Sequence, residues 1–101
     1  MSTTILMEEF KEALKSKKLS ELLNYGEIYC SKEDFFSLMS LIWDKAISEG
    51  LKIEGPILTT ERGLNKLQYN VKKNNEVIGE ISYYYGNYYL RYKSFVTFSR
   101  K

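Results

Sequence analysis

Aromatic and cationic side chains crowd the last part of the chain, and their chemistry suits binding better than bond-breaking. Aromatic rings stack on nucleic-acid bases or fill pockets in protein partners, while Lys and Arg pair with phosphates or carboxylates. Residues 81–101 contain no acidic residue, four basic residues and eight aromatic residues. The candidate binding residues are Lys72, Tyr84, Tyr89, Arg91, Lys93 and Phe95.

A predicted hairpin at Gly86-Asn87 would place these residues on one face of a sheet. Gly-Asn between two tyrosines is a strong signal for a two-residue turn. This turn would pair Tyr84 with Tyr89, Ser82 with Arg91 and Glu80 with Lys93. We expect a polar and on balance cationic face there. The opposite, apolar face would carry Ile81, Tyr83, Tyr85, Tyr88, Leu90, Tyr92, Val96 and Phe98.

The preceding turn supports the same division into two faces. A three-residue loop, Asn74-Asn75-Glu76, would set Val71 opposite Gly79 and Tyr69 opposite Ile81. A strict two-residue loop would bury the opposite set of side chains, because a slip of one residue exchanges the faces of a strand. We therefore expect the longer loop, which adds Gln68, Asn70 and Lys72 to the polar face.

The first half of the chain is predicted to supply the helices. Residues 1–61 hold 11 acidic and 7 basic side chains, whereas residues 62–101 hold 2 acidic and 8 basic ones. One helix is expected near Ile5–Lys17, followed by a short helical turn around Leu19–Leu23. The clearest helix begins at a Ser31 cap and ends before Gly50. Its predicted core stripe consists of Phe35, Leu38, Met39, Ile42, Ala46 and Ile47, widened by Phe36 and Trp43.

These patterns predict one α+β domain over residues 1–101. Residues 1–50 are mainly helical and residues 64–99 form an antiparallel β-meander, three to four strands in all, with the helices packed on one face. Between them, Leu51–Ile53 and Ile57–Thr60 fit two short strands around a Gly55-Pro56 turn, before a polar loop at residues 59–63.

Composition removes several classes of enzyme. The chain has no histidine and a single cysteine, Cys30, so a Cys/His zinc site, a Ser-His-Asp triad and an intramolecular disulfide cannot be built within it. No glycine-rich phosphate loop is present, and we expect no catalytic residue, metal or cofactor. Cys30 fits a small buried side chain, although its place before a helix leaves a reactive thiol as the alternative.

The cellular location of the protein and the kind of genome that encodes it can be predicted only from general features of the sequence. The apolar runs are far shorter than the ~20 residues that span a bilayer, and the first residues do not resemble a signal peptide. We expect a cytoplasmic protein with no membrane partner. The small size, the preference for Lys over Arg and the Ile/Tyr-rich composition resemble accessory proteins of viruses and other mobile elements, including inhibitors of host factors.

Three interpretations of the polar face remain open. It is a solvated sheet with ordinary cross-strand pairs, a platform for single-stranded nucleic acid, or a protein–protein interface. The leading hypothesis is a small non-enzymatic protein that binds single-stranded nucleic acid. The alternative is a protein-interaction module, either a homodimer or an inhibitor of another macromolecule.

Overall fold

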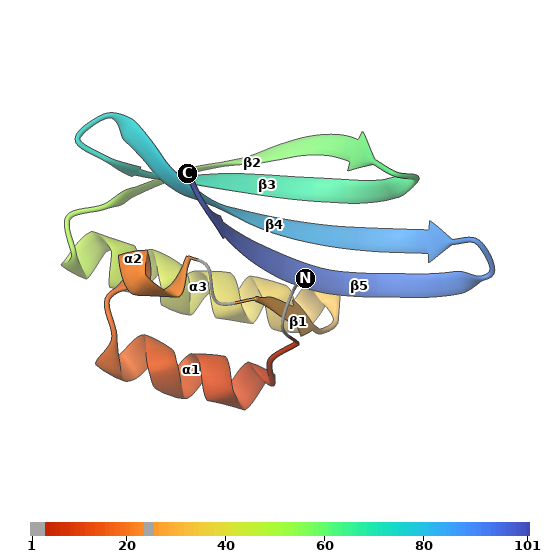
Figure 1. Ribbon diagram of the computed structural model, residues 1–101, viewed down its shortest axis with the longest axis horizontal. Coiled ribbons are helices and arrows are strands. Elements are labelled where there is room, and N and C mark those ends of the chain that lie inside the picture. The colour runs from red at the N-terminus through yellow and green to blue at the C-terminus, as the bar shows by residue number, and fades with distance from the viewer. Residues whose placement is uncertain (1–3, 24–25) are drawn as a thin grey trace.

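Three helices cover one face of a five-stranded antiparallel sheet (Figure 1). The computed structural model describes residues 4–23 and 26–101. In space the strands follow the order β1-β5-β4-β3-β2. The elements are α1 (Met7–Ser16), α2 (Leu19–Leu22), β1 (Glu27–Tyr29), α3 (Lys32–Ser48), β2 (Lys52–Glu61), β3 (Leu64–Lys73), β4 (Glu76–Tyr88) and β5 (Arg91–Arg100).

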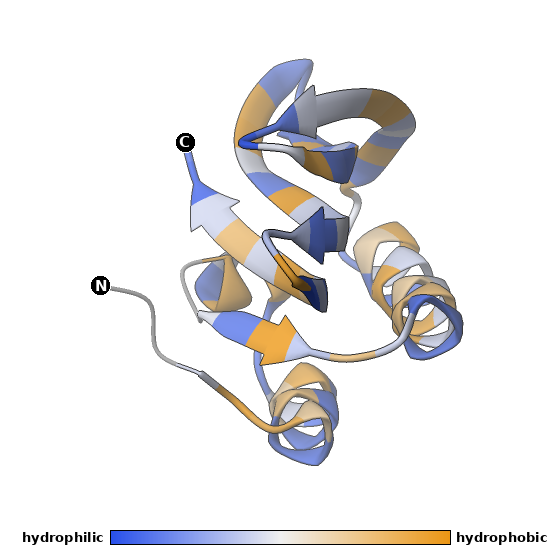
Figure 2. Ribbon diagram, turned by 90° about the vertical axis from the view of Figure 1, so that its right-hand side faces the viewer, coloured by the Kyte–Doolittle hydropathy of each residue, from blue (hydrophilic) through white to orange (hydrophobic). Residues whose placement is uncertain are grey.

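The predicted fold class is confirmed, with helices first and a meander after them. Strands β2 to β5 form the meander. The short β1, which the sequence did not reveal, pairs with β5. Figure 2 looks nearly along the strands and shows α1 and α3 on the same side of the sheet.

Helix α3 begins and ends where the sequence predicts. The Ser31 hydroxyl accepts a hydrogen bond from the Asp34 amide at 3.1 Å, and Gly50 adopts a φ of 72° just beyond the last turn. One side of the helix is buried, with Phe35, Leu38, Met39, Ile42 and Ala46 in the core. The prediction that Ile47, Phe36 and Trp43 belong to the core is wrong, because they are 68%, 46% and 38% exposed.

Stacked aromatic pairs join the helices to the sheet. The Phe35 ring lies 4.4 Å from the ring of Tyr83 on β4, and the Phe10 ring lies 4.5 Å from that of Phe98 on β5 (centroid distances). All four side chains are buried. The face of the sheet that carries Tyr83 and Phe98 is the helix-covered face, and the other is called the open face below.

The β3–β4 register is as predicted, but it has a different cause. Val71 lies opposite Gly79 and Tyr69 opposite Ile81. The turn itself contains only Asn74 and Asn75, both at positive φ, because Lys73 pairs with Glu76. A register shift beyond Val71 supplies the extra residue, as a β-bulge does.

The predicted turn between β4 and β5 is wrong. Tyr88 pairs with Arg91, so the chain turns at Tyr89-Leu90 and not at Gly86-Asn87. The expected partners of Tyr84, Ser82 and Glu80 are replaced by Phe95, Thr97 and Ser99. The later turn lets all of β5 pair with β4, whereas the Gly-Asn turn would have left its last residues beyond the start of β4. The observed register differs from the predicted one by an even number of residues. The side chains of β4 and β5 therefore point to the sides of the sheet that were predicted, except near the turn.

Strand β2 is longer than expected. It runs without interruption from Lys52 to Glu61, where two short strands and a loop were predicted. A bulge at Gly55-Pro56 shifts its register with β3. Gly55 has a φ of 137°, and an added Cβ would lie 2.6 Å from the Gln68 carbonyl oxygen. The bulge therefore depends on glycine.

Candidate binding surface at the hairpin tip and open face

An aromatic row crosses the open face. Tyr29 on β1, Phe95 on β5, Tyr84 on β4 and Lys66 on β3 lie at matching positions of the ladder. The Phe95 ring lies 5.3 Å from that of Tyr29 and 5.2 Å from that of Tyr84, and the Lys66 ammonium lies 5.6 Å from the Tyr84 ring. Because the Tyr84 and Phe95 rings are stacked on each other, they offer little ring face to a partner.

The open face is not cationic over the body of the sheet, which corrects the expectation. The strand register places Glu27, Glu54, Glu61 and Glu80 on it, and the basic residues there are Lys52, Lys66 and Lys72. Each of these lysines is paired with a glutamate. The distances are 3.3 Å for Lys66–Glu61, 3.8 Å for Lys66–Glu80, 3.2 Å for Lys72–Glu54 and 3.5 Å for Lys52–Glu54.

The sequence missed these acids for two reasons. β1 was not predicted, which hid Glu27. The β2 segment was predicted as two short strands and a loop, so neither Glu54 nor Glu61 was assigned to a face of the sheet. Four glutamates against three lysines leave this part of the sheet near neutrality.

Hydrogen bonds shift the pKa values of three side chains on the open face. The Tyr84 hydroxyl donates to Glu61 Oε2 at 3.0 Å, and this bond, helped by Lys66, lowers the pKa of the Glu61 carboxyl. A bond from Lys72 lowers the pKa of Glu54 in the same way. Burial, and then the bond to Glu61, raises the pKa of Tyr84. Tyr84 therefore remains a neutral phenol that donates a hydrogen bond.

The β4–β5 hairpin projects beyond the helices and carries a different chemistry (Figure 1). Its tip residues Tyr89 and Leu90 are 88% and 100% exposed, and Tyr92 is 63% exposed. Arg91 and Lys93 beside them are also exposed. We call residues 88–93 the hairpin tip. It contains three tyrosines, one leucine, two cations and no acid.

Ring contacts give the tip a defined shape. The rings of Tyr88 and Tyr89 meet edge to face at 4.6 Å, and the Lys93 ammonium lies 5.2 Å from the Tyr88 ring. Tyr89 adopts a φ of 59°, a conformation that is unfavourable for a bulky side chain. A surface hollow of about 420 Å³ is lined by Tyr88, Tyr89, Leu90, Arg91 and Lys93.

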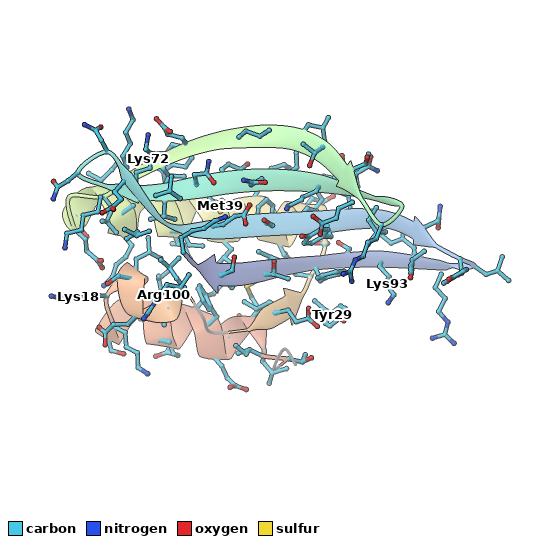
Figure 3. All side chains as sticks on the ribbon, turned by 45° about the horizontal axis from the view of Figure 1, so that its top comes forward. Lys18, Tyr29, Met39, Lys72, Lys93 and Arg100 are labelled. Carbon is cyan, nitrogen blue, oxygen red and sulfur yellow. The ribbon has the colours of Figure 1, made fainter. Side chains whose placement is uncertain are left out.

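A second hollow adjoins the base of the tip. It has a volume of about 520 Å³ and lies between the start of α3 and β5. Figure 3 shows Tyr29 and Lys93 near one another at this end of the molecule. The hollow is lined by residues 29–33 on one side and by Tyr92, Lys93 and Ser94 on the other. The tip and this hollow together offer aromatic, aliphatic and cationic groups on one end of the fold, with one carboxylate, that of Glu33, among them.

The six binding residues predicted from the sequence lie at three separate places in the structure. Tyr89, Arg91 and Lys93 come together at the hairpin tip. Tyr84 and Phe95 belong to the aromatic row. Lys72 is paired with Glu54 near the opposite end of the sheet, as Figure 3 shows for Lys72 and Lys93. The sequence missed Tyr29, Leu90 and Tyr92, since the misplaced turn had assigned Leu90 and Tyr92 to the core.

Cys30 is not set up as a reactive thiol. Burial, and then the nearby Asp34 carboxylate, raises its pKa to about 11, so the thiolate is scarce at neutral pH. Its carbonyl oxygen accepts a 2.5 Å hydrogen bond from the Ser94 hydroxyl, which also bonds the Tyr83 hydroxyl. Across residues 4–23 and 26–101, acidic residues and Cys30 form no group that could hold a metal ion.

Comparisons with models of protein families, with curated proteins and with solved structures find no match to this chain. Within the described part of the chain, every helix is too short or too polar to cross a membrane.

Proposed function

We propose that this chain is a non-enzymatic binding protein whose hairpin tip enters an acidic, partly apolar groove on another protein. The observation that carries the proposal is the composition of the tip, where Leu90 is fully exposed between two exposed tyrosines and next to two cations. Tyr and Arg, with Trp, are enriched among the residues that dominate binding energy at protein interfaces. A protruding leucine gains binding energy only if an apolar pocket receives it.

The charge pattern indicates an acidic partner. Among the described residues neither Arg91 nor Lys93 forms an ion pair, although Glu33 lines the same hollow as Lys93, whereas the lysines on the body of the sheet are already paired with glutamates. Positive charge at an exposed tip accelerates encounter with an acidic surface. An inhibitor of another macromolecule, the alternative drawn from the sequence, would use such a tip to occupy the groove of its target.

Single-stranded nucleic acid is the second candidate, and one observation favours it. Three tyrosines and two cations at the tip are the groups that stack bases and hold phosphates. Against it, the neutral body of the sheet offers no cationic path for a strand beyond the tip, and Leu90 at the apex has no counterpart in a base or phosphate. We therefore rank a protein partner first.

Two measurements separate these candidates. The first is affinity capture from lysate of the cells in which the protein occurs, with and without nuclease, followed by quantitative mass spectrometry. A protein partner is retained after nuclease treatment. The second is the anisotropy of labelled mixed-sequence single-stranded DNA and RNA over a salt series. Tight binding that weakens steeply with salt, together with nuclease-sensitive capture, would reverse the ranking.

A further inference from the structure

The two edges of the sheet differ in how much of their backbone is already paired. At one edge, β1 is only three residues long, and the Ile5 amide donates to the Glu27 carbonyl oxygen at 2.9 Å. At the other edge, β2 has ten residues and pairs only with β3 in the described part of the chain. We call this second edge the free edge. A long strand with a free edge is a template for pairing with another strand.

The turn after β2 determines which backbone groups face the free edge. The two residues of the turn, 62–63, both have positive φ, and the strands close on the pair Glu61–Leu64. The closing pair of such a two-residue turn is hydrogen-bonded, so every second residue back from Glu61 bonds to β3. The amides and carbonyl groups of Leu58 and Thr60 therefore point away from β3, toward the free edge.

Helix α3 presents an uncharged stripe on the same side of the molecule. Its residues follow one another at helical spacing and are all exposed: Phe36, Ser40, Trp43 and Ile47. The Trp43 ring meets that of Tyr69 on β3 edge to face, with the centroids 6.4 Å apart. On the opposite side of α3, Leu41 and Lys45 line the hollow between α3 and α1. The stripe therefore faces away from α1, toward β2, and Figure 2 shows α3 displaced from α1 in that direction.

The stripe and the free edge run beside each other. The Phe35 ring stacks on Tyr83, which lies in line with Leu58 across the sheet. Phe36, the next residue of α3, is therefore level with Leu58. The Ile47 end of the stripe lies near the start of β2, because α3 ends only a few residues before that strand. One helical turn rises about 5.4 Å and two strand residues span about 6.6 Å, so successive turns of the stripe match alternate side chains of a strand placed beside β2.

We propose that the free edge of β2 and the α3 stripe form a groove that binds an extended segment of another protein. The segment adds a strand to the sheet. In strand addition, backbone hydrogen bonds give affinity and alternate side chains give selectivity. Here Leu58 and Thr60 supply the backbone groups, and the stripe receives every second side chain. A helix in the same place would leave those backbone groups unpaired.

The charges of the groove define the chemistry of the segment. Residues 57–60 and the α3 stripe carry no charge. At the ends of β2 the charges are balanced, since Glu61 is next to Arg62 and Glu54 is paired with two lysines. A charged side chain turned toward the stripe would lose its water without gaining an ion partner. The segment therefore has apolar residues at the alternate positions that face α3 and no charge at its centre.

The first test uses a library of ten-residue peptides, displayed on phage and selected on the immobilised full chain. We expect the enriched peptides to carry uncharged apolar residues at alternate positions. Leu58→Lys places a charge in the groove, and Thr60→Pro removes an amide that faces the free edge. Each should weaken binding of the most enriched peptide, labelled with fluorescein, by about 10-fold or more. Leu41→Lys is the matched control, since Leu41 is 44% exposed on α3 but lies beside α1, and it should bind the peptide like the wild type.

Hydrogen exchange followed by NMR locates the added strand residue by residue. In the free chain the amides of Leu58 and Thr60 should exchange fast, while that of Thr59, bonded to β3, exchanges slowly. The peptide should slow the first two. Leu90→Ser should leave peptide binding unchanged, because β3 and β4 separate β2 from β5 and the hairpin tip. The groove and the proposed function of the tip are therefore tested independently.

Three results would overturn the proposal. The first is a selection that enriches no peptide. The second is equal peptide binding by the wild type, Leu58→Lys and Thr60→Pro, with circular dichroism showing that both variants are folded. The third is a wild-type chain that has twice the monomer mass in light scattering and protects the amides of Leu58 and Thr60 without peptide, which would assign the free edge to a second copy.

Discussion

The Lys93 ammonium lies 5.2 Å from the centroid of the Tyr88 ring, across the last pairs of the β4–β5 hairpin. This cation–π contact lies where the β4–β5 hairpin extends beyond the helices (Figure 1). Tyr88 in turn meets Tyr89 edge to face. This chain of contacts gives the hairpin tip a shape before any partner arrives, which lowers the entropy lost on binding.

Replacing Tyr89 by glycine should separate binding from stability. Tyr89 has a positive φ, which costs a bulky residue roughly 1–2 kcal/mol and costs glycine almost nothing. Part of that gain is lost because glycine is more flexible in the unfolded chain, so we expect the free energy of unfolding to stay unchanged or to rise by up to about 1 kcal/mol. Partner binding should fall. Urea denaturation and capture efficiency measure the two effects, and a variant that is less stable but binds normally would contradict this prediction.

Charge reversal at the tip should act on association. Arg91→Glu combined with Lys93→Glu removes the two exposed cations beside Leu90, and we expect the association rate to fall by about 10-fold or more at low salt. The difference from wild type should shrink as salt rises. Stability should change by no more than about 0.5 kcal/mol, because both side chains are exposed. Surface plasmon resonance over a salt series, once a partner is captured, gives the rates. Equal rates for both proteins would show that the cations take no part.

The buried polar chain below the tip should contribute to stability alone. The Tyr83 hydroxyl bonds Ser94, whose hydroxyl also reaches the Cys30 carbonyl, and Tyr83 itself is fully buried. Tyr83→Phe removes one buried hydrogen bond and keeps the ring stacked on Phe35. We expect a loss of about 1 kcal/mol in the free energy of unfolding with no change in partner binding. Denaturant melts and capture of the same variant would test both halves, and an unchanged midpoint would show that this bond adds nothing.

Acid should weaken the fold through the open face. The folded-state pKa values of Glu61 and Glu54 are lowered, so their contribution is complete above the unfolded pKa, about 4.3. It is lost as pH falls through the lower folded values. Between about pH 5.5 and 8 the stability should be flat, because the chain has no histidine.

Two variants test the origin of this acid dependence. Glu61→Gln removes the titrating group, and Tyr84→Phe removes the hydrogen bond that contributes most to the lowered pKa of Glu61. Both should flatten the decline below about pH 4.5, where glutamate begins to gain protons. The effect should be modest because Glu61 is exposed to solvent and its ion pairs are screened. Urea midpoints at a series of pH values measure it. A wild-type slope in both variants would place the acid sensitivity elsewhere.

Local sequence signals predicted the elements more reliably than they predicted the partners of those elements. The Ser31 cap and Gly50 mark the ends of α3 because both act within one turn of helix. Glycine and asparagine at residues 86–87 gave an equally local signal for a turn, yet the hairpin turns at Tyr89-Leu90. There the pairing of Tyr83 with Val96 and of Ile81 with Phe98, inside the core, outweighs the preference of two residues.

The charge of the open face depended on contacts between distant parts of the chain. Glu27 and Glu54 are separated from Tyr84 by many residues, and only the sheet order brings them to the same face. Composition alone suggested a basic half and an acidic half. The structure shows that acidic residues of the first half lie beside basic residues of the second half on the sheet, and that the hairpin tip carries two exposed cations and no acid. Arg91 and Lys93 were identified from sequence because alternation within one strand survives an even error in register.

The most direct test of a protein-binding tip compares two leucine variants in quantitative capture from nuclease-treated lysate. Leu90→Ser changes the fully exposed apex, and Leu41→Ser changes an exposed leucine on α3 that lies away from the tip. We predict that at least one protein captured by the wild type falls by about 10-fold or more with Leu90→Ser, as loss of a buried leucine allows. The same protein should be retained with Leu41→Ser. Equal capture by all three proteins would contradict the account.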